Sequence, residues 1–90
     1  MIFRWPDTKD PSDESWWEID CRNELGDATL VSASWTVPTG LTKLDEAITD
    51  TTARIKLGDG IVGRMALTID FHTSNDELFE RTVILHVRER

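Results

Sequence analysis

Histidine is the residue type here that most often supports metal or acid–base chemistry, and the chain has two, His72 and His86. Both lie in segments where apolar and polar residues alternate, at positions expected to face outward. A Ser-Asn-Asp turn at 74–76 would join the two segments as a hairpin. In that hairpin His72 faces residues 79–80 and His86 faces residues 65–66, several rungs apart, which is too far for shared metal ligation. We interpret both as solvated strand histidines. No serine is placed beside either one, so a Ser-His-Asp arrangement is not indicated.

Cys21 is the one thiol in the chain. A lone cysteine excludes an internal disulfide framework and a cysteine-based zinc site. It lies beside Ile19 on the apolar phase of its segment, so we expect a buried, unreactive thiol.

Arg81 lies on an inward phase, between Phe79 and Val83. We expect it near a strand start, where it reaches the sheet edge or pairs with an acid such as Asp70 or Asp20. This pattern does not indicate a catalytic arginine.

Two further motifs resemble ligand loops. Gly58-Asp59-Gly60 is followed by Gly63, but no helix comes after it to hold a phosphate, and it predicts a hairpin turn instead. Acidic groups at 10–14, 45–46 and 76–77 lack the converging spacing of a calcium loop and are interpreted as solvated loops. The sequence therefore predicts no catalytic residue, no metal site and no cofactor.

The elements that would position these residues are short strands. Apolar and polar residues alternate in segments separated by Gly, Pro or Asn-Asp signals, and helical spacing is nearly absent. The expected strands are 17–21, 30–37, 53–57, 65–71 and 79–87. Two antiparallel sheets packed face to face would bury their apolar stripes, so we predict an immunoglobulin-like β-sandwich with Trp17 and Trp35 at its centre; a small five-stranded barrel is the alternative. The segment 41–50 contains helix-forming residues and is expected as a loop.

Length and charge limit the class of protein. Ninety residues form one small domain, and seventeen acidic against ten basic side chains give a net charge of −7. This charge argues against a nucleic-acid partner. No apolar run approaches the roughly 18 residues of a membrane span, and the N-terminus lacks the apolar core of a signal peptide, so no membrane partner is expected.

Residues 1–15 differ in composition from the rest. They contain two of the three prolines and a cluster of Asp, Ser and Glu. Prolines remove backbone donors and favour extended conformations, so we expect an extended N-terminal arm at 1–15 followed by the sandwich domain at 16–90.

Large apolar side chains stand on or beside this arm: Ile2, Phe3, Trp5 and Trp16. The first three either fold back on the sandwich as an edge strand or plug, or dock on a neighbouring subunit. If Trp17 points inward, Trp16 points outward and is available for contact. We predict these four as a partner interface, since aromatic residues are enriched in such surfaces.

A series of short motifs follows along residues 9–88: Lys9-Asp10-Pro11, Trp17-Glu18-Ile19-Asp20, Leu25-Gly26-Asp27, Ser34-Trp35-Thr36-Val37-Pro38, Gly40-Leu41, Thr51-Thr52-Ala53 and Thr82-Val83-Ile84-Leu85-His86-Val87-Arg88. The series resembles a family of small tailed-bacteriophage virion proteins, described as fibre-like or Ig-like and encoded among head and head–tail genes. Two positions depart from the family pattern. Cys21 stands where the family usually has Trp, and the 41–50 loop contains more helix-forming residues than the family pattern.

The resemblance implies a non-enzymatic virion structural protein with an Ig-like fold, as a capsid-decorating, head–tail or fibre-type component. Such a protein would form a homo-oligomer, with a trimer favoured, dock on other virion proteins and be assembled in the bacterial cytoplasm. An alternative is a host-surface carbohydrate-binding module, in which Trp16 stacks on a sugar near Asn23 and Glu24. An acidic DNA-mimicking inhibitor is a third hypothesis, which the −7 charge permits.

Overall fold

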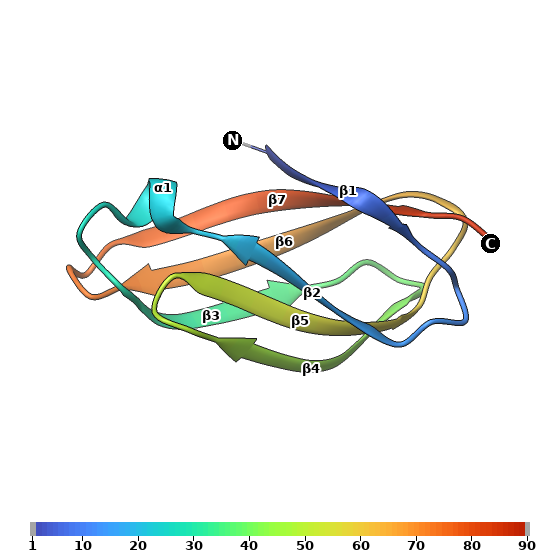
Figure 1. The fold of residues 1–90 in the computed structure, drawn as a ribbon, viewed down its shortest axis with the longest axis horizontal. Coiled ribbons are helices and arrows are strands. Elements are labelled where there is room, and N and C mark those ends of the chain that lie inside the picture. The colour runs from blue at the N-terminus through green and yellow to red at the C-terminus, as the bar shows by residue number, and fades with distance from the viewer. Residues whose placement is uncertain (1, 90) are drawn as a thin grey trace.

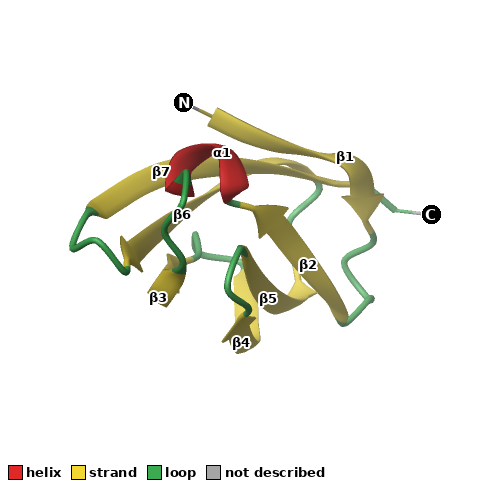
Figure 2. Ribbon diagram, turned by 60° about the vertical axis from the view of Figure 1, so that its left-hand side comes forward, coloured by secondary structure: helices red, strands yellow, loops and turns green. Residues whose placement is uncertain are grey.

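The computed structural model describes residues 2–89 as two β-sheets packed face to face, with principal extents of 41 × 23 × 19 Å (Figures 1 and 2). One sheet has the strand order β1-β7-β6-β3 and the other β2-β5-β4. The strands are β1 (Ile2–Lys9), β2 (Ser15–Asp20), β3 (Leu30–Thr36), β4 (Leu41–Ile48), β5 (Thr52–Asp59), β6 (Gly63–Thr73) and β7 (Leu78–Val87). The predicted all-β sandwich is confirmed; all pairings are antiparallel except that of β1 with β7.

The β6–β7 hairpin forms as the alternation predicts. Phe71 lies opposite Phe79, their rings stack at 5.3 Å, and Asp76 takes the positive φ of the connecting turn. The inward residues, such as Leu67 and Val83, are fully buried. Local patterning was sufficient here because both strands and their turn are adjacent in sequence.

The prediction of a loop at 41–50 is wrong. Residues 41–48 form β4, which pairs along its length with β5 from Leu41 opposite Asp59 to Ile48 opposite Ala53. The helix-forming residues of this segment carry only a weak intrinsic preference, and pairing with a partner strand outweighs it.

The predicted hairpin at 58–60 is also wrong. β5 has β2 on one edge and β4 on the other, so no edge is left for β6, which belongs to the opposite sheet. The chain after Asp59 crosses between the sheets. Asp59, Gly60 and Gly63 all have positive φ values there, so the turn chemistry serves a crossing instead of a hairpin.

The core is centred on three tryptophans. Trp35 is buried as predicted and Trp17 is half-buried, but the ring between them is Trp5, only 8% exposed. The Trp5 ring stacks on Trp35 at 5.9 Å and tilts against Trp17 at 5.2 Å. Residues 2–9 thus lie against the sandwich as edge strand β1.

At each side of the sandwich, side chains from one sheet bind the backbone of an edge strand of the other sheet. On the β1–β2 side, Trp5 Nε1 donates to the Glu18 carbonyl at 2.8 Å. On the β3–β4 side, Lys43 Nζ donates to the Trp35 carbonyl at 3.0 Å, and the Trp35 N–H donates to Glu46 Oε1 at 3.2 Å. The contact on the first side is made by an aromatic side chain, and those on the second side by charged side chains.

A single helical turn, α1 (Arg22–Leu25), follows β2. Its Glu24 carboxylate accepts from Arg81 Nη2 at 2.8 Å, with both side chains largely buried. The predicted partners of Arg81, Asp70 or Asp20, were therefore wrong, because the helical turn brings an acid over β7 that strand patterning does not reveal. No helix within residues 2–89 has the length and apolar character to cross a membrane.

Candidate partner-binding surface

The two histidines lie at opposite ends of the β6–β7 hairpin, opposite Leu78 in one case and Arg64 in the other. His72 Nε2 lies 3.0 Å from Asp76 Oδ1 at the exposed turn. Over residues 2–89 no group of three His, Cys, Asp or Glu side chains is arranged to hold a metal ion. The register therefore keeps the histidines apart, as the sequence indicated.

Cys21 is fully buried, which confirms its predicted placement. Burial, with smaller contributions from the Asp20 and Glu24 charges, raises the pKa of the Cys21 thiol to about 11. The group is thus a neutral core side chain and not a nucleophile.

The four residues predicted as an interface occupy different environments. Ile2 is 53% exposed at the start of β1, opposite Thr82, and Phe3 is partly buried against the core. Trp5 belongs to the core. Trp16 is 40% exposed on the outer face of β2. Within this set, Ile2 and Trp16 present apolar surface to solvent.

Trp16 is held in place by its neighbours on the three-stranded sheet. It lies opposite Lys56, and the Arg54 guanidinium lies 4.8 Å from the centre of its ring. Arg54 in turn lies 3.5 Å from the Glu18 carboxylate. An exposed indole with a fixed orientation loses little conformational entropy when a partner covers it.

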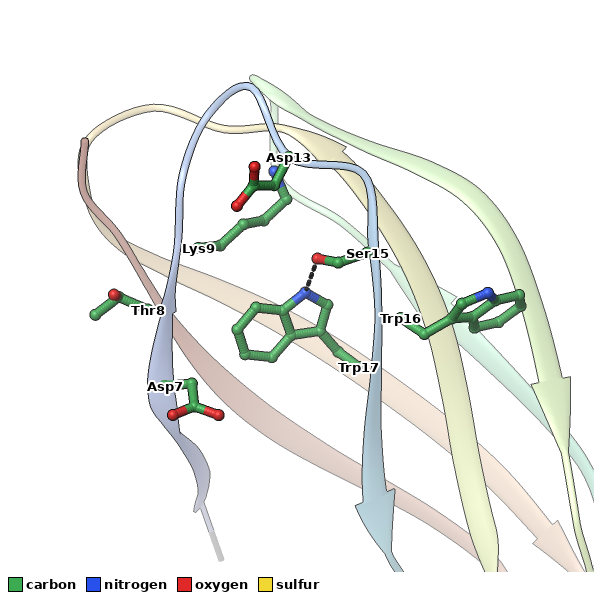
Figure 3. A pocket seen from close by; sticks show the side chains of 7 residues that line it. All are labelled: Asp7, Thr8, Lys9, Asp13, Ser15, Trp16 and Trp17. Atoms are coloured by element: carbon green, nitrogen blue, oxygen red, sulfur yellow. Dashed lines mark hydrogen bonds between the residues drawn. The ribbon is translucent and has the colours of Figure 1, made fainter. Parts of the chain in front are cut away.

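Beside Trp16, a cavity of about 400 Å³ opens between the ends of β1 and β2 (Figure 3). The lining residues are Asp7, Thr8, Lys9, Asp13, Ser15, Trp16 and Trp17. The Trp17 indole lies between the two strands and donates to Ser15 Oγ at 2.9 Å, with Asp7 and Asp13 to either side (Figure 3). An aromatic surface flanked by carboxylates is suited to a cationic side chain.

Lys9 forms the inner end of this cavity and is almost fully buried. Its Nζ donates to the carbonyl oxygens of Asp10 and Asp59, which joins the β1–β2 connection to the end of β5. Burial lowers the pKa of Lys9, while the surrounding carboxylates, Asp13 first among them, oppose that shift. The Lys9 ammonium thus has a structural role, and the exposed charged groups that line the cavity are the carboxylates of Asp7 and Asp13.

The residues weighed for carbohydrate binding are not brought together. Trp16 is near the start of β2, whereas Asn23 and Glu24 belong to α1, beyond the other end of that strand. The four residue steps of strand from Trp16 to Asp20 already span about 13 Å. The Glu24 carboxylate is also occupied by Arg81.

Sequence reasoning missed two contributors to this surface. The Arg54 contact with Trp16 depends on the β2–β5 register, which no local pattern reveals. The burial of Lys9 depends on a connection from β5, fifty residues away. The acid-rich stretch around Lys9 was the one available signal, and we interpreted it as solvated.

Comparison with known proteins identifies a family of similar sequence and solved structures of similar fold. A family model described as podophage GP4 fiber-tail adaptor protein gp77 matches residues 9–86. The crystal structure of the cysteine protease inhibitor EhICP2 from Entamoeba histolytica superposes with a TM-score of 0.54 and 12% identity, covering 97% of this chain and 84% of that one. At that identity the similarity concerns the fold alone. No curated protein matches the chain.

Proposed function

The chain belongs to the podophage GP4 fiber-tail adaptor protein family, and from this premise we propose that it is a non-enzymatic virion protein that joins a fibre to the phage tail. Membership confirms the predicted resemblance to tailed-phage virion proteins. The observation that carries the proposal is the family match across residues 9–86, which includes β2 to β6 entirely and β7 except its last residue, but only Lys9 of β1.

The proposed mechanism is binding by a rigid surface. Trp16, fixed by Arg54, supplies an aromatic anchor on the outer face of the three-stranded sheet. The few residues that dominate an interface are enriched in Trp and each cost about 2 kcal/mol or more on truncation. The adjoining cavity, with Asp7 and Asp13 beside the Trp17 indole, would accept a Lys or Arg of the partner.

We also propose that the protein assembles into the virion in the host cytoplasm as a homo-oligomer, with a trimer favoured. Ile2 is a large apolar residue, 53% exposed, at the start of the described N-terminal segment, and it is the anchor we assign to the contact between copies. Repetition of a small contact in a closed ring strengthens it through multivalency. Light scattering after size-exclusion chromatography measures this directly, and a monomer at assembly concentrations would contradict it.

The test of the adaptor function is binding to tails purified from particles that lack this protein, and to purified fibres. Wild-type protein is expected to cosediment with both. Trp16→Ala should weaken one of the two interactions at least tenfold, because the anchor is lost while the fold is not, and Trp16→Phe should retain most of the affinity.

Leu78→Ala is the matched control, since Leu78 is an exposed apolar residue at the β6–β7 turn, away from Trp16. Loss of binding in Leu78→Ala but not in Trp16→Ala would place the interface elsewhere. Failure of the wild-type protein to bind either tails or fibres would overturn the adaptor function.

A further inference from the structure

β3 is the least protected of the four edge strands. Edge strands usually carry charges, prolines or bulges that prevent another chain from pairing with them. β1 contains Arg4 and Pro6, β2 contains Glu18 and Asp20, and β4 carries three charged residues at 43–46. β3, with the sequence LVSASWT, has no charge and no proline; its one irregularity is a register shift after Leu30.

The interior beside β3 is incompletely filled. Ile48 lies opposite the buried Ala53 and so faces inward, yet it is 38% exposed, and Val31 is 57% exposed. A cavity of about 280 Å³ opens here between β3 and β4. The residues that line it are Val31, Ser32, Ala33, Trp35, Glu46, Ala47 and Ile48. This side of the sandwich therefore lacks apolar side chains that would cover Val31 and Ile48.

Backbone groups of β3 face the same opening. The N–H and C=O of Trp35 point away from β6, because they bind the side chains of Glu46 and Lys43. By the two-residue repeat of a strand, the N–H and C=O of Ala33 face the same edge. The buried indole N–H of Trp35 also lacks an acceptor among the described residues. The opening thus offers backbone pairing as well as apolar contact.

The loops at the start of β3 are acidic. Leu30 N–H donates to the Asp50 carbonyl at 2.8 Å, and Ser74 N–H donates to the Thr29 carbonyl at 2.8 Å, so three loops meet at this point. Their exposed carboxylates include Asp27, Asp50 and Glu77. A segment that enters beside β3 would meet negative charge at this end.

We propose that the side of the sandwich between β3 and β4 accepts an extended segment of another virion protein, which adds a strand to β3, inserts alternate apolar side chains into the cavity and carries a basic residue next to the acidic loops. The inference rests on the proposed adaptor function. Strand addition gives affinity through the backbone and specificity through alternate side chains. A second copy fits less well: its β3 has already buried Leu30 and Trp35 in its own core, and it brings a further net charge of −7 to an acidic surface.

The test uses the purified tails and fibres and the full-length chain. Ala33→Pro removes the N–H that faces the free edge and breaks no hydrogen bond with β6, whereas Ala33→Ser keeps that N–H and serves as the matched control. We expect Ala33→Pro to lose at least tenfold in affinity for one of the two partners and Ala33→Ser to bind as wild type. Hydrogen exchange at the Ala33 amide of the wild-type protein should slow in the complex.

Val31→Asp is the second variant, because an exposed side chain can be replaced without disturbing the core. It places a charge in the apolar opening and should also weaken binding tenfold or more, and it decides the matter if Ala33→Pro does not fold. Binding by both variants at the Ala33→Ser level would overturn the strand-addition site and leave the adaptor function intact. If wild-type protein binds neither tails nor fibres, the adaptor function itself fails, and this inference with it.

Discussion

Replacement of Trp5 best distinguishes between two roles of the N-terminal segment, a free arm and a strand that belongs to the folded domain. If residues 1–15 were a free arm, changing Trp5 would affect assembly and leave the fold alone. In the structure its indole lies between Trp17 and Trp35 and donates to the Glu18 carbonyl at 2.8 Å. Its replacement should therefore destabilise the domain itself.

The size of the effect follows from these contacts. Truncation of a buried Trp to Ala costs about 3–5 kcal/mol, and the unsatisfied Glu18 carbonyl adds about 1 kcal/mol. A domain of this length has a total stability of roughly 5–13 kcal/mol, so Trp5→Ala removes much of it. Trp5→Phe keeps an aromatic ring and loses mainly the hydrogen bond and some volume, which predicts a cost of about 1–2 kcal/mol.

Urea unfolding followed by tryptophan fluorescence or circular dichroism measures these differences, with Trp17→Phe as the control. Trp17 is half-buried and its indole N–H donates to Ser15 Oγ, so its replacement should cost less than Trp5→Phe. Hydrogen exchange should show protected amides in β1 of the wild-type protein and their loss in Trp5→Ala. Wild-type stability in Trp5→Phe, together with unprotected β1 amides in the wild-type protein, would refute the structural assignment of β1.

Two further predictions concern buried polar groups. Glu24 binds the Arg81 guanidinium at 2.8 Å, so Glu24→Gln leaves that cation without its counter-charge. The substitution should lower the free energy of unfolding by about 1–3 kcal/mol, measured by urea unfolding. An unchanged unfolding midpoint would mean that α1 does not depend on this pair. For Cys21, burial raises the pKa, so the neutral thiol contributes stability that is complete below the ordinary thiol pKa and is lost as the pH rises through about 11. Wild-type protein should therefore lose on the order of 2 kcal/mol more than Cys21→Ala between pH 8 and pH 11, and a parallel pH dependence of the two proteins would contradict this.

The features predicted correctly from sequence are those decided by neighbouring residues. The β6–β7 hairpin needs only alternation and a Ser-Asn-Asp turn, and the outward position of Trp16 follows from the inward position of Trp17. Cys21 was placed in the core by the same two-residue repeat.

The features that were missed depend on residues far apart in the chain. The segment 41–48 becomes a strand because β5 pairs with it, and helix-forming side chains do not prevent this on an edge. Gly58-Asp59-Gly60 has the same local chemistry whether the chain returns beside β5 or crosses to the other sheet, and the outcome is set by β2, which already occupies that edge. For residues 2–9 the sequence left two alternatives open, an edge strand or an arm docked on a neighbour, and the structure shows the edge strand. Pro6 is tolerated there because it lies where the β1–β7 register is interrupted, between Arg4 and Thr8.

The candidate surfaces likewise combine features set by neighbouring residues with features set by residues far apart in the chain. Exposure of an aromatic residue can be read from alternation, but the cation that fixes it, the buried Lys9 and the open side between β3 and β4 arise only from the arrangement of the sheets.

An adaptor has to bind two different partners at once, and the two open sides of this sandwich are suited to different tasks. On the β1–β2 side, Trp5 and Trp17 seal the core and leave a preformed surface with Trp16 and two carboxylates. On the β3–β4 side, Lys43 and Glu46 cover the edge of β3 at one residue, Trp35, and the core beside Val31 and Ile48 stays open. The first surface would dock against a folded neighbour without changing shape, whereas the second would take an extended segment that completes the sheet. Because the intact core separates the two sides, occupation of one leaves the other free, which is the geometric condition for a protein that joins two components.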